Sequence, residues 1–342
     1  MFKITNGIRN FILRTIHESK IMNRLVCLLF VTLVISCSKE SNDSNSKSNV
    51  SSIENNAPTS NDNSSSGDSS SSNDTTTSND TSSEVKVVFN SKVHSSLPSE
   101  WVEQYNIILD TLDKRIPVYN NNYDDLDIYA WNSNTDKPYS SEIGDTGGAC
   151  ICGNDQKRYM VLEIPEDEFK YNSMHRYSVI AHEFFHAYQM SISANFNSGD
   201  FRVKWLSEGP AAVFESLYVR EHYDYNYFIY DQERVDKEAV SNPSIYESYD
   251  SGGDSNYSSS VFMTLALVKE LVKLDNTEAD AIRMILKDFQ LQNPGAANWK
   301  DVFKQVFSFS VDSFYTKLSD YQADINTVVP AENLTLQGIF NN

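Results

Sequence analysis

The sequence contains little cysteine, which limits the metal sites and cross-links that it can form. Only four of the 342 residues are cysteine, and Cys27 and Cys37 belong to an apolar N-terminal segment. Cys150 and Cys152 are separated by one residue, whereas zinc-binding cysteine pairs have two intervening residues and recur along the chain. We therefore expect no cysteine-built metal site. In an oxidising compartment this pair forms either a small-loop disulfide or two free thiols.

Basic residues are also scarce. Lys and Arg number 28 against 47 Asp and Glu, which gives a formal net charge of −19. Binding to nucleic acid requires clustered Lys and Arg that neutralise phosphates, so we expect no nucleic-acid partner. We attribute the excess of acid to solubility rather than to attraction of a cationic substrate.

The N-terminal apolar run, Leu25–Ile35, is too short to span a bilayer as a helix. It follows the basic stretch Lys20–Arg24 and ends at Cys37 in Leu-Val-Ile-Ser-Cys, which resembles the lipobox of bacterial lipoproteins. The resemblance implies a signal peptide over residues 1–36 and lipid attached at Cys37, and so a cell-envelope protein anchored to the outer membrane or the cell surface. The alternatives are an ordinary signal peptide or an uncleaved anchor. A signal peptide that began at Met22 would be complete and compact, and our hypothesis is that translation starts at Met22.

The segment after the lipobox has little apolar content. Residues 37–83 are dominated by Ser, Asn, Asp and Thr, which bury too little surface to offset the entropy of ordering. We expect this segment to be a disordered tether that connects the lipid to a folded domain. Residues 84–342 have the composition of that domain and suffice for a complete core.

Within this domain, strand patterns come early and helix patterns come late, which predicts an α+β fold. The predicted strands are 85–89, 126–131 and 158–164, and a turn containing Gly and Cys is expected at 147–153. An active-site core is expected at about 158–275 and a helical C-terminal part at 276–342. The predicted helices are 99–114, 174–193, 206–221, 257–274, 277–291, 298–307 and 311–324.

The run His182-Glu183-Phe184-Phe185-His186 carries the chemistry. Helical residues four apart share a face, so His182 and His186 can present two imidazoles to one ion. Glu183 is rotated by about 100° from His182, which is close enough to accept a proton from water without being a ligand. The alternative is two core histidines beside a surface glutamate. His175 lies on the same face, but about 10 Å from His182, too far to share the ion.

A hydrolytic zinc site needs a third protein ligand and one open position for water. Glu208, in Trp-Leu-Ser-Glu-Gly-Pro-Ala-Ala, follows His186 by 22 residues, enough for the first helix to end and a second to begin. Pro210 is best tolerated in the first turn of a helix, which predicts that Glu208 lies near a helix N-terminus. The alternative is a first-turn glutamate that is favoured only by the helix dipole.

The pair of motifs resembles the gluzincin metallopeptidases, in particular the peptidase MA-like group, over about residues 160–270. The resemblance implies that His182, His186 and Glu208 bind one Zn²⁺ and that Glu183 activates water. It also implies a thermolysin-like catalytic core, with a small sheet over the active-site helix and an edge strand along the cleft that pairs with the substrate backbone. The strand at 158–164 is the candidate for that edge.

Two further positions follow from the resemblance. The family often has a tyrosine or histidine that donates a hydrogen bond to the oxyanion, and Tyr257, before a run of serines, is our candidate over His222. The alternative is an ordinary tyrosine at a helix start. The family also commonly has an acidic residue four positions after the ligand glutamate, where this chain has Ala212. Gln189 or a backbone carbonyl must then orient the imidazoles, because otherwise metal binding is weak.

The expected function is therefore that of a zinc metallopeptidase of the cell envelope, acting on a peptide or protein substrate. Two alternatives remain open. One is a catalytically degenerate surface binding protein on the same scaffold, supported only by Ala212. The other is a zinc hydrolase that cleaves a non-protein amide, whose metal site would look the same.

Overall fold

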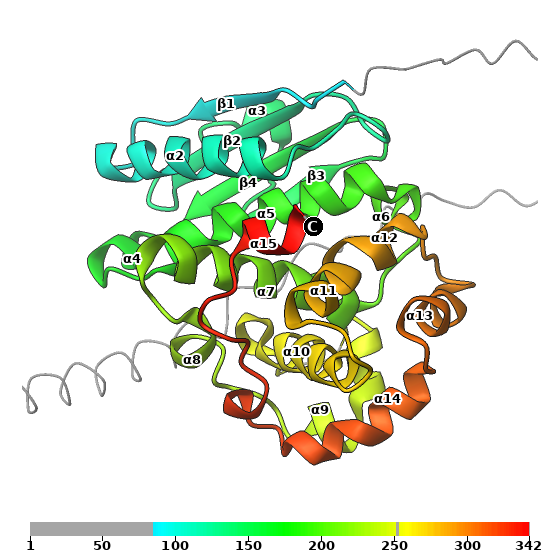
Figure 1. Ribbon diagram of the computed structural model, residues 1–342. Helices are drawn as coiled ribbons and strands as arrows, with labels where there is room; N and C mark the ends of the chain where they lie inside the picture. Colours follow the sequence, from blue (N-terminus) through cyan, green and yellow to red (C-terminus); the bar gives the residue numbers. More distant parts are fainter. Residues whose placement is uncertain (1–84, 251–252, 342) are drawn as a thin grey trace, which may run out of the picture. The chain divides into compact units, whose positions relative to one another are not determined.

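A computed structural model of the chain describes residues 85–250 and 253–341 (Figure 1). Within these residues the protein has a mixed α/β fold with one sheet, whose first three strands in spatial order are parallel and whose last strand is antiparallel. The sheet precedes most of the helices, which is compatible with the predicted α+β arrangement. In spatial order the strands are β1 (Phe89–Val93), β2 (Leu126–Asn132), β4 (Arg158–Ile164) and β3 (Ala149–Gly153).

The predicted first strand was wrong in position. Residues 85–89 are Val-Lys-Val-Val-Phe, an apolar run rich in β-branched residues, but only an isolated bridge from Lys86 to Tyr119 forms there. The strand lies four residues later, where Phe89 pairs with Leu126 of β2. β1 is an edge strand of mixed burial, so its sequence carries little of the periodicity that marks a strand. The predictions at 126–131 and 158–164 are confirmed as β2 and β4.

The turn predicted at 147–153 was also wrong, because residues 149–153 form strand β3. β3 pairs with β4, with Cys150 opposite Val161 and Cys152 opposite Tyr159. Side chains two apart on a strand point to the same face, and the two cysteines form a disulfide across that face. Ala149 and Gly153, at the two ends of this strand, are of residue types depleted in strands, so the pairing partner defines the strand more than the local sequence does.

Helices account for most of the remaining chain, and the long helices agree with the predictions within a few residues. Two predictions hold only in part. The helix at 277–291 is interrupted by a π-helical turn at Met284–Asp288, and the helix at 311–324 is an α-helix only to Lys317, after which Leu318–Tyr321 forms a 3₁₀ helix. The α-helices are α2 (Ser99–Arg115), α3 (Ser140–Ile143), α4 (Glu166–Lys170), α5 (His175–Ile192), α6 (Ala194–Ser198), α7 (Lys204–Tyr223), α8 (Tyr227–Tyr230), α9 (Glu238–Ser241), α10 (Ser258–Val272), α11 (Glu278–Arg283), α12 (Phe289–Leu291), α13 (Trp299–Phe307), α14 (Val311–Lys317) and α15 (Leu336–Phe340).

The molecule is layered, with the sheet and α2 on one side, α5 crossing next to them, and α7 and α10 beyond α5 (Figure 1). One face of the sheet shares the main core with α2 and α5. The other face forms a smaller aromatic cluster around Tyr129 and Trp131, which Ile143 of α3 covers. On α5, the fully buried Ile180 and Phe184 each contribute roughly 1.5–3 kcal/mol through burial. This packing fixes the face of α5 that carries the histidines.

Pro210 does not lie in the first turn of its helix, contrary to the prediction. α7 begins at Lys204, so Glu208 is its fifth residue and Pro210 lies in the interior. Proline removes the hydrogen bond to the carbonyl four residues earlier, which here is that of Leu206. The buried side chain of Gln290 donates to this carbonyl at 3.4 Å and so offsets part of the cost. Sequence reasoning missed this partner because it lies 84 residues away.

Gly209 allows the close packing of α7 against α10. A Cβ atom at this position would lie 2.3 Å from Thr264 Oγ1 and 2.5 Å from the carbonyl oxygen of Ser260. Neither contact is possible without moving one of the helices. Gly209, directly after Glu208, therefore allows α10 to approach the face of α7 that carries the Glu208 carboxylate. The residues just before α10 approach the same face.

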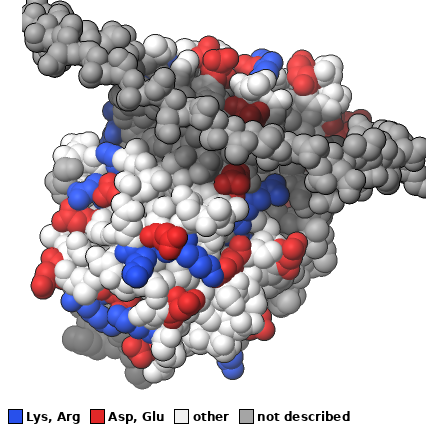
Figure 2. All heavy atoms as spheres, turned by 90° about the vertical axis from the view of Figure 1, so that its right-hand side faces the viewer, with Lys and Arg blue, Asp and Glu red and all other residues white. Residues whose placement is uncertain are grey.

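On the face shown in Figure 2, acidic side chains are interspersed with basic ones, a distribution that keeps a surface hydrated without a field of one sign. Over residues 85–250 and 253–341, no helix combines the length and apolar character needed to cross a membrane. The predicted signal peptide 1–36, the start at Met22, the lipidation at Cys37 and the tether 37–83 lie outside the described residues.

Candidate metal centre

The link between α5 and α7 places their polar faces together. α5 ends at Ile192, and Ser193 begins α6 by accepting a hydrogen bond from the backbone nitrogen of Phe196. Gly199 ends α6 with a φ of 77°, a left-handed conformation that glycine adopts at little cost. The chain then turns back and α7 begins, so that Glu208 faces the histidines of α5.

Three side chains converge between these helices. His182 Nε2 lies 3.1 Å from His186 Nε2. Glu208 Oε2 lies 3.3 Å from the His182 nitrogen and 3.2 Å from the His186 nitrogen. The three residues are 6, 9 and 8% exposed for His182, His186 and Glu208. The structure therefore brings together the three side chains that the sequence predicted as metal ligands.

The spacing of these atoms fits a small tetrahedral ion. Bonds of about 2.0–2.1 Å to nitrogen and oxygen separate the donors of a tetrahedral zinc site by about 3.3–3.4 Å. The three observed separations lie between 3.1 and 3.3 Å. Two imidazoles and one carboxylate are also a donor set that divalent transition metals prefer. The group can therefore hold a metal ion, and it is the only group of three or more such side chains found among the described residues.

Glu183 lies beside this group without belonging to it. Its Oε2 atom is buried and has no hydrogen-bond partner among the described residues. Burial raises the pKa of Glu183, while His186 and His182 partly oppose this effect. A buried carboxylate oxygen without a partner is costly unless water or a ligand reaches it. This oxygen is therefore free to accept a proton from a water molecule in the site.

Gln189 orients the second imidazole. Its Oε1 lies 2.7 Å from His186 Nδ1, while its Nε2 donates to the carbonyl of Ser207 at 3.3 Å. Because the amide nitrogen is engaged elsewhere, its oxygen accepts from Nδ1–H, and the lone pair of His186 Nε2 faces the metal group. Gln189 thus has the orienting role that the sequence allowed it.

Glu215 orients the first imidazole, and sequence reasoning missed it. Its Oε2 lies 3.6 Å from His182 Nδ1, and the side chain is buried. Burial alone would lower the pKa of His182, but the carboxylates of Glu208 and Glu215 outweigh it and raise the pKa well above its usual value. Glu215 follows Glu208 by seven residues, so both lie on one face of α7. The acid expected at Ala212 is therefore supplied three residues later, and the seven-residue spacing was the available signal.

No family model, no curated protein and no solved structure matches the chain.

Tyr257 lies next to the metal group, whereas His222 does not. The ring of Tyr257 stacks on the His182 imidazole, with centroids 5.6 Å apart and planes inclined by 17°. It precedes α10 with a φ of 57°, directly after Asn256 at 50°. Its hydroxyl makes no hydrogen bond to a described residue. His222 lies near the end of α7, where it contacts Arg115 at 3.3 Å, about 21 Å along the helix from Glu208.

Tyr249 is a second tyrosine at the site, and no pattern in the sequence marked it. Its hydroxyl donates a hydrogen bond of 2.8 Å to Glu208 Oε1. The residue lies outside any helix or strand, and it is one of 19 tyrosines in the chain. Only the tertiary structure distinguishes it from the others.

The edge strand beside α5 is β3, which corrects the prediction for residues 158–164. β4 is flanked by β2 and β3, so its backbone groups are already paired on both sides. β3 pairs only with β4 among the described strands and contacts α5. The free backbone edge beside α5 therefore belongs to the strand with the Cys150–Cys152 disulfide.

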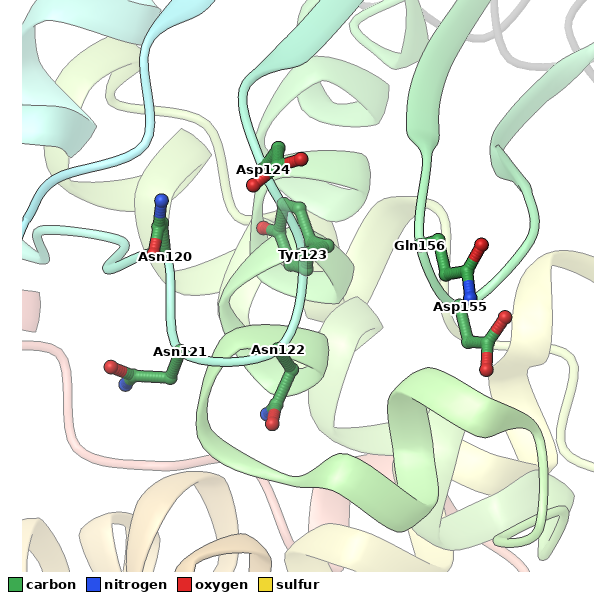
Figure 3. Close-up of a pocket in the computed structure, with 7 residues that line it drawn as sticks. All are labelled: Asn120, Asn121, Asn122, Tyr123, Asp124, Asp155 and Gln156. Carbon is green, nitrogen blue, oxygen red and sulfur yellow. The ribbon is translucent and has the colours of Figure 1, made fainter.

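A polar hollow of about 290 Å³ lies apart from the metal group (Figure 3). It opens between the loop before β2 and the β3–β4 turn, near the C-terminal end of α5, where Asn122 donates to the carbonyls of Met190 and Ser191. No His, Cys or acid cluster with metal-binding spacing lies in it. Its lining residues are Asn120, Asn121, Asn122, Tyr123, Asp124, Asp155 and Gln156.

His175 is paired with Glu168 rather than with the metal group. Its Nδ1 lies 2.7 Å from Glu168 Oε1. Burial would lower the pKa of His175, but the charge and hydrogen bond of Glu168 raise it to about 9. The folded value exceeds the unfolded value of about 6.5, so the pair stabilises the fold fully below pH 6.5 and progressively less as the pH rises through 9.

We expect the free energy of unfolding to fall by less than about 1 kcal/mol across this range because of the pair, since the imidazole is 44% exposed and solvent screens it. Urea unfolding at a series of pH values measures the effect. The Glu168→Gln variant should lack this component of the pH dependence. If wild type and variant show parallel curves between pH 6.5 and 9, the pair contributes nothing.

Proposed function

We propose that the protein is a zinc metallopeptidase of gluzincin type with a thermolysin-like catalytic core. The observation that carries the proposal is the convergence of His182, His186 and Glu208 on one point, with the free carboxylate oxygen of Glu183 beside it. The HExxH spacing on one helix and a glutamate on the next are the features shared with that family. A bound zinc ion would supply Lewis-acid activation of water and of the scissile carbonyl.

In this proposal each residue near the ligands has a separate task. Glu183 removes a proton from the attacking water and passes it to the leaving amine. Tyr257, whose hydroxyl has no partner among the described residues, donates a hydrogen bond to the developing oxyanion of the substrate. The free edge of β3 pairs with an extended substrate backbone, as an edge strand does in β-augmentation. The substrate is a peptide or protein, and lipid at Cys37 holds the enzyme at the cell envelope.

The two alternatives have less support. The degenerate binding protein rested on Ala212, and the contact of Glu215 with His182 removes that reason. A non-protein amide substrate would use the same metal group, and no observation favours it over a peptide.

The test is metal analysis combined with a cleavage assay on the purified protein. We expect about one zinc ion per chain by elemental analysis and cleavage within a peptide library that stops with a chelator and returns with added zinc. Bound zinc without cleavage of any peptide would contradict the peptidase but not the metal site. Absence of bound zinc from protein dialysed against micromolar zinc would contradict both.

A further inference from the structure

The two oxygens of Glu208 face different partners. Oε2 points toward the two imidazoles at 3.3 and 3.2 Å. Oε1 accepts the hydrogen bond of the Tyr249 hydroxyl at 2.8 Å. A carboxylate can bind a metal through one oxygen or both, and a hydroxyl donor that holds one of them favours binding through the other. The hydrogen bond of Tyr249 is therefore suited to limit Glu208 to a single metal-facing oxygen.

This limit matters for the chemistry of the site. A catalytic zinc site needs three protein donors and an open position for water. If Glu208 supplied both oxygens, together with the two imidazole nitrogens, the protein itself would fill four positions. A hydroxyl that holds Oε1 away from the metal therefore helps to keep the fourth position open.

Tyr249 makes this contact from an exposed position. It lies between the 3₁₀ helices η1 (Pro243–Glu247) and η2 (Ser255–Tyr257), and 49% of the residue is exposed. Its hydroxyl donates a hydrogen bond to Glu208, and the side chain of Ser207 also lies next to this hydroxyl. Removal of this hydroxyl takes away its hydrogen bond to Glu208 and its contact with Ser207 but leaves a half-exposed ring, so the fold should tolerate Tyr249→Phe.

Tyr257 provides the contrast. Its ring stacks on His182, and the amine of Lys204 lies 5.7 Å from the centre of the same ring. These contacts involve the ring, which Tyr257→Phe retains, while the hydroxyl makes no contact with Glu208 as close as a hydrogen bond. Tyr249 therefore contacts the metal group through its hydroxyl, whereas Tyr257 contacts it through its ring.

We propose that Tyr249 is a positioning residue that holds Glu208 in single-oxygen coordination and so maintains an open position on the metal. The proposal depends on the metal group and, for its catalytic consequence, on the function proposed above. In this proposal the two hydroxyls have different roles. The hydroxyl of Tyr249 binds the metal ligand Glu208, and the hydroxyl of Tyr257 remains available to the substrate.

The experiment compares full-length Tyr249→Phe with Tyr257→Phe as its matched control, using Zn²⁺ and Co²⁺ alone as probes. For Tyr249→Phe we expect zinc affinity, measured by competition with a chromophoric chelator, to fall roughly 10- to 100-fold. We also expect the visible absorption of the Co²⁺ form to weaken, because four-coordinate Co²⁺ absorbs more strongly than five-coordinate Co²⁺. For Tyr257→Phe we expect both readouts to match wild type.

The outcomes are distinct. Wild-type affinity and an unchanged Co²⁺ spectrum in Tyr249→Phe would overturn the proposal, and so would equal losses in both variants. Thermal unfolding of the metal-free proteins shows whether a lower zinc affinity comes from a damaged fold. If Tyr249→Phe lowered both the zinc affinity and the stability of the metal-free protein, that result would also contradict the proposal. Neither readout requires turnover, so a failure to find any cleaved substrate leaves this result standing.

Discussion

Replacement of Glu183 by Gln is expected to leave metal binding intact and to lower hydrolysis by roughly 10²- to 10⁴-fold. Glu183 is not one of the three converging ligands, so the amide should not disturb the metal group. The carboxylate is buried, and its Oε2 has no partner among the described residues, which is the environment of a group that acts on a bound water. Glutamine has the same shape but does not accept the proton.

The measurement pairs kcat/KM on the best cleaved peptide with zinc content by elemental analysis. Glu103→Gln is the matched control, because it makes the same chemical change at an exposed position of α2 and should keep full activity. Full activity in Glu183→Gln would rule out the proposed general base. Loss of zinc in this variant would instead make Glu183 part of the metal site.

The main helices and the convergence of the candidate metal-binding side chains could be predicted because their signals are local. His182 and His186 lie one turn apart on a helix whose opposite face is apolar, and a helical period is visible in a window of about 11–18 residues. Glu208 required one further step, a second helix after a short link. Helix–loop–helix segments of this length place neighbouring elements in contact, so the approach of Glu208 to the two histidines could also be predicted from the sequence.

The features that escaped prediction mostly depend on partners that the local pattern does not show. β3 is a strand because it pairs with the next strand, β4, and the carbonyl left free by Pro210 is satisfied by Gln290, 84 residues later. Tyr249 reaches Glu208 across 41 residues from a segment with no periodic pattern. Such contacts depend on how elements pack, which the local sequence does not encode. Glu215 differs, because its spacing from Glu208 was visible and only the assumption of a four-residue interval concealed it.

Replacement of Glu208 by Gln is expected to abolish stoichiometric zinc binding at micromolar metal. Zinc sites of this class use three protein donors, and an amide oxygen is a much weaker donor than a carboxylate. The loss should exceed the roughly 10- to 100-fold typical of removing a group that only orients a ligand. Because bound metal stabilises the folded state, each 100-fold loss of affinity removes about 2.7 kcal/mol of zinc-dependent stability at saturating metal. The rise in Tm on adding zinc measures this directly.

Glu215→Gln is the graded comparison for that experiment. Glu215 contacts His182 Nδ1 at 3.6 Å but does not belong to the converging group, so its loss should lower zinc affinity only about 10- to 100-fold and leave a reduced rise in Tm. Glutamine preserves the shape of both side chains, so differences between the two variants reflect charge and donor strength rather than packing. If Glu208→Gln retained the wild-type zinc-dependent rise, Glu208 would not be a ligand. The two imidazoles would then need another third donor, and the convergence of the three side chains would require an explanation other than a metal ion.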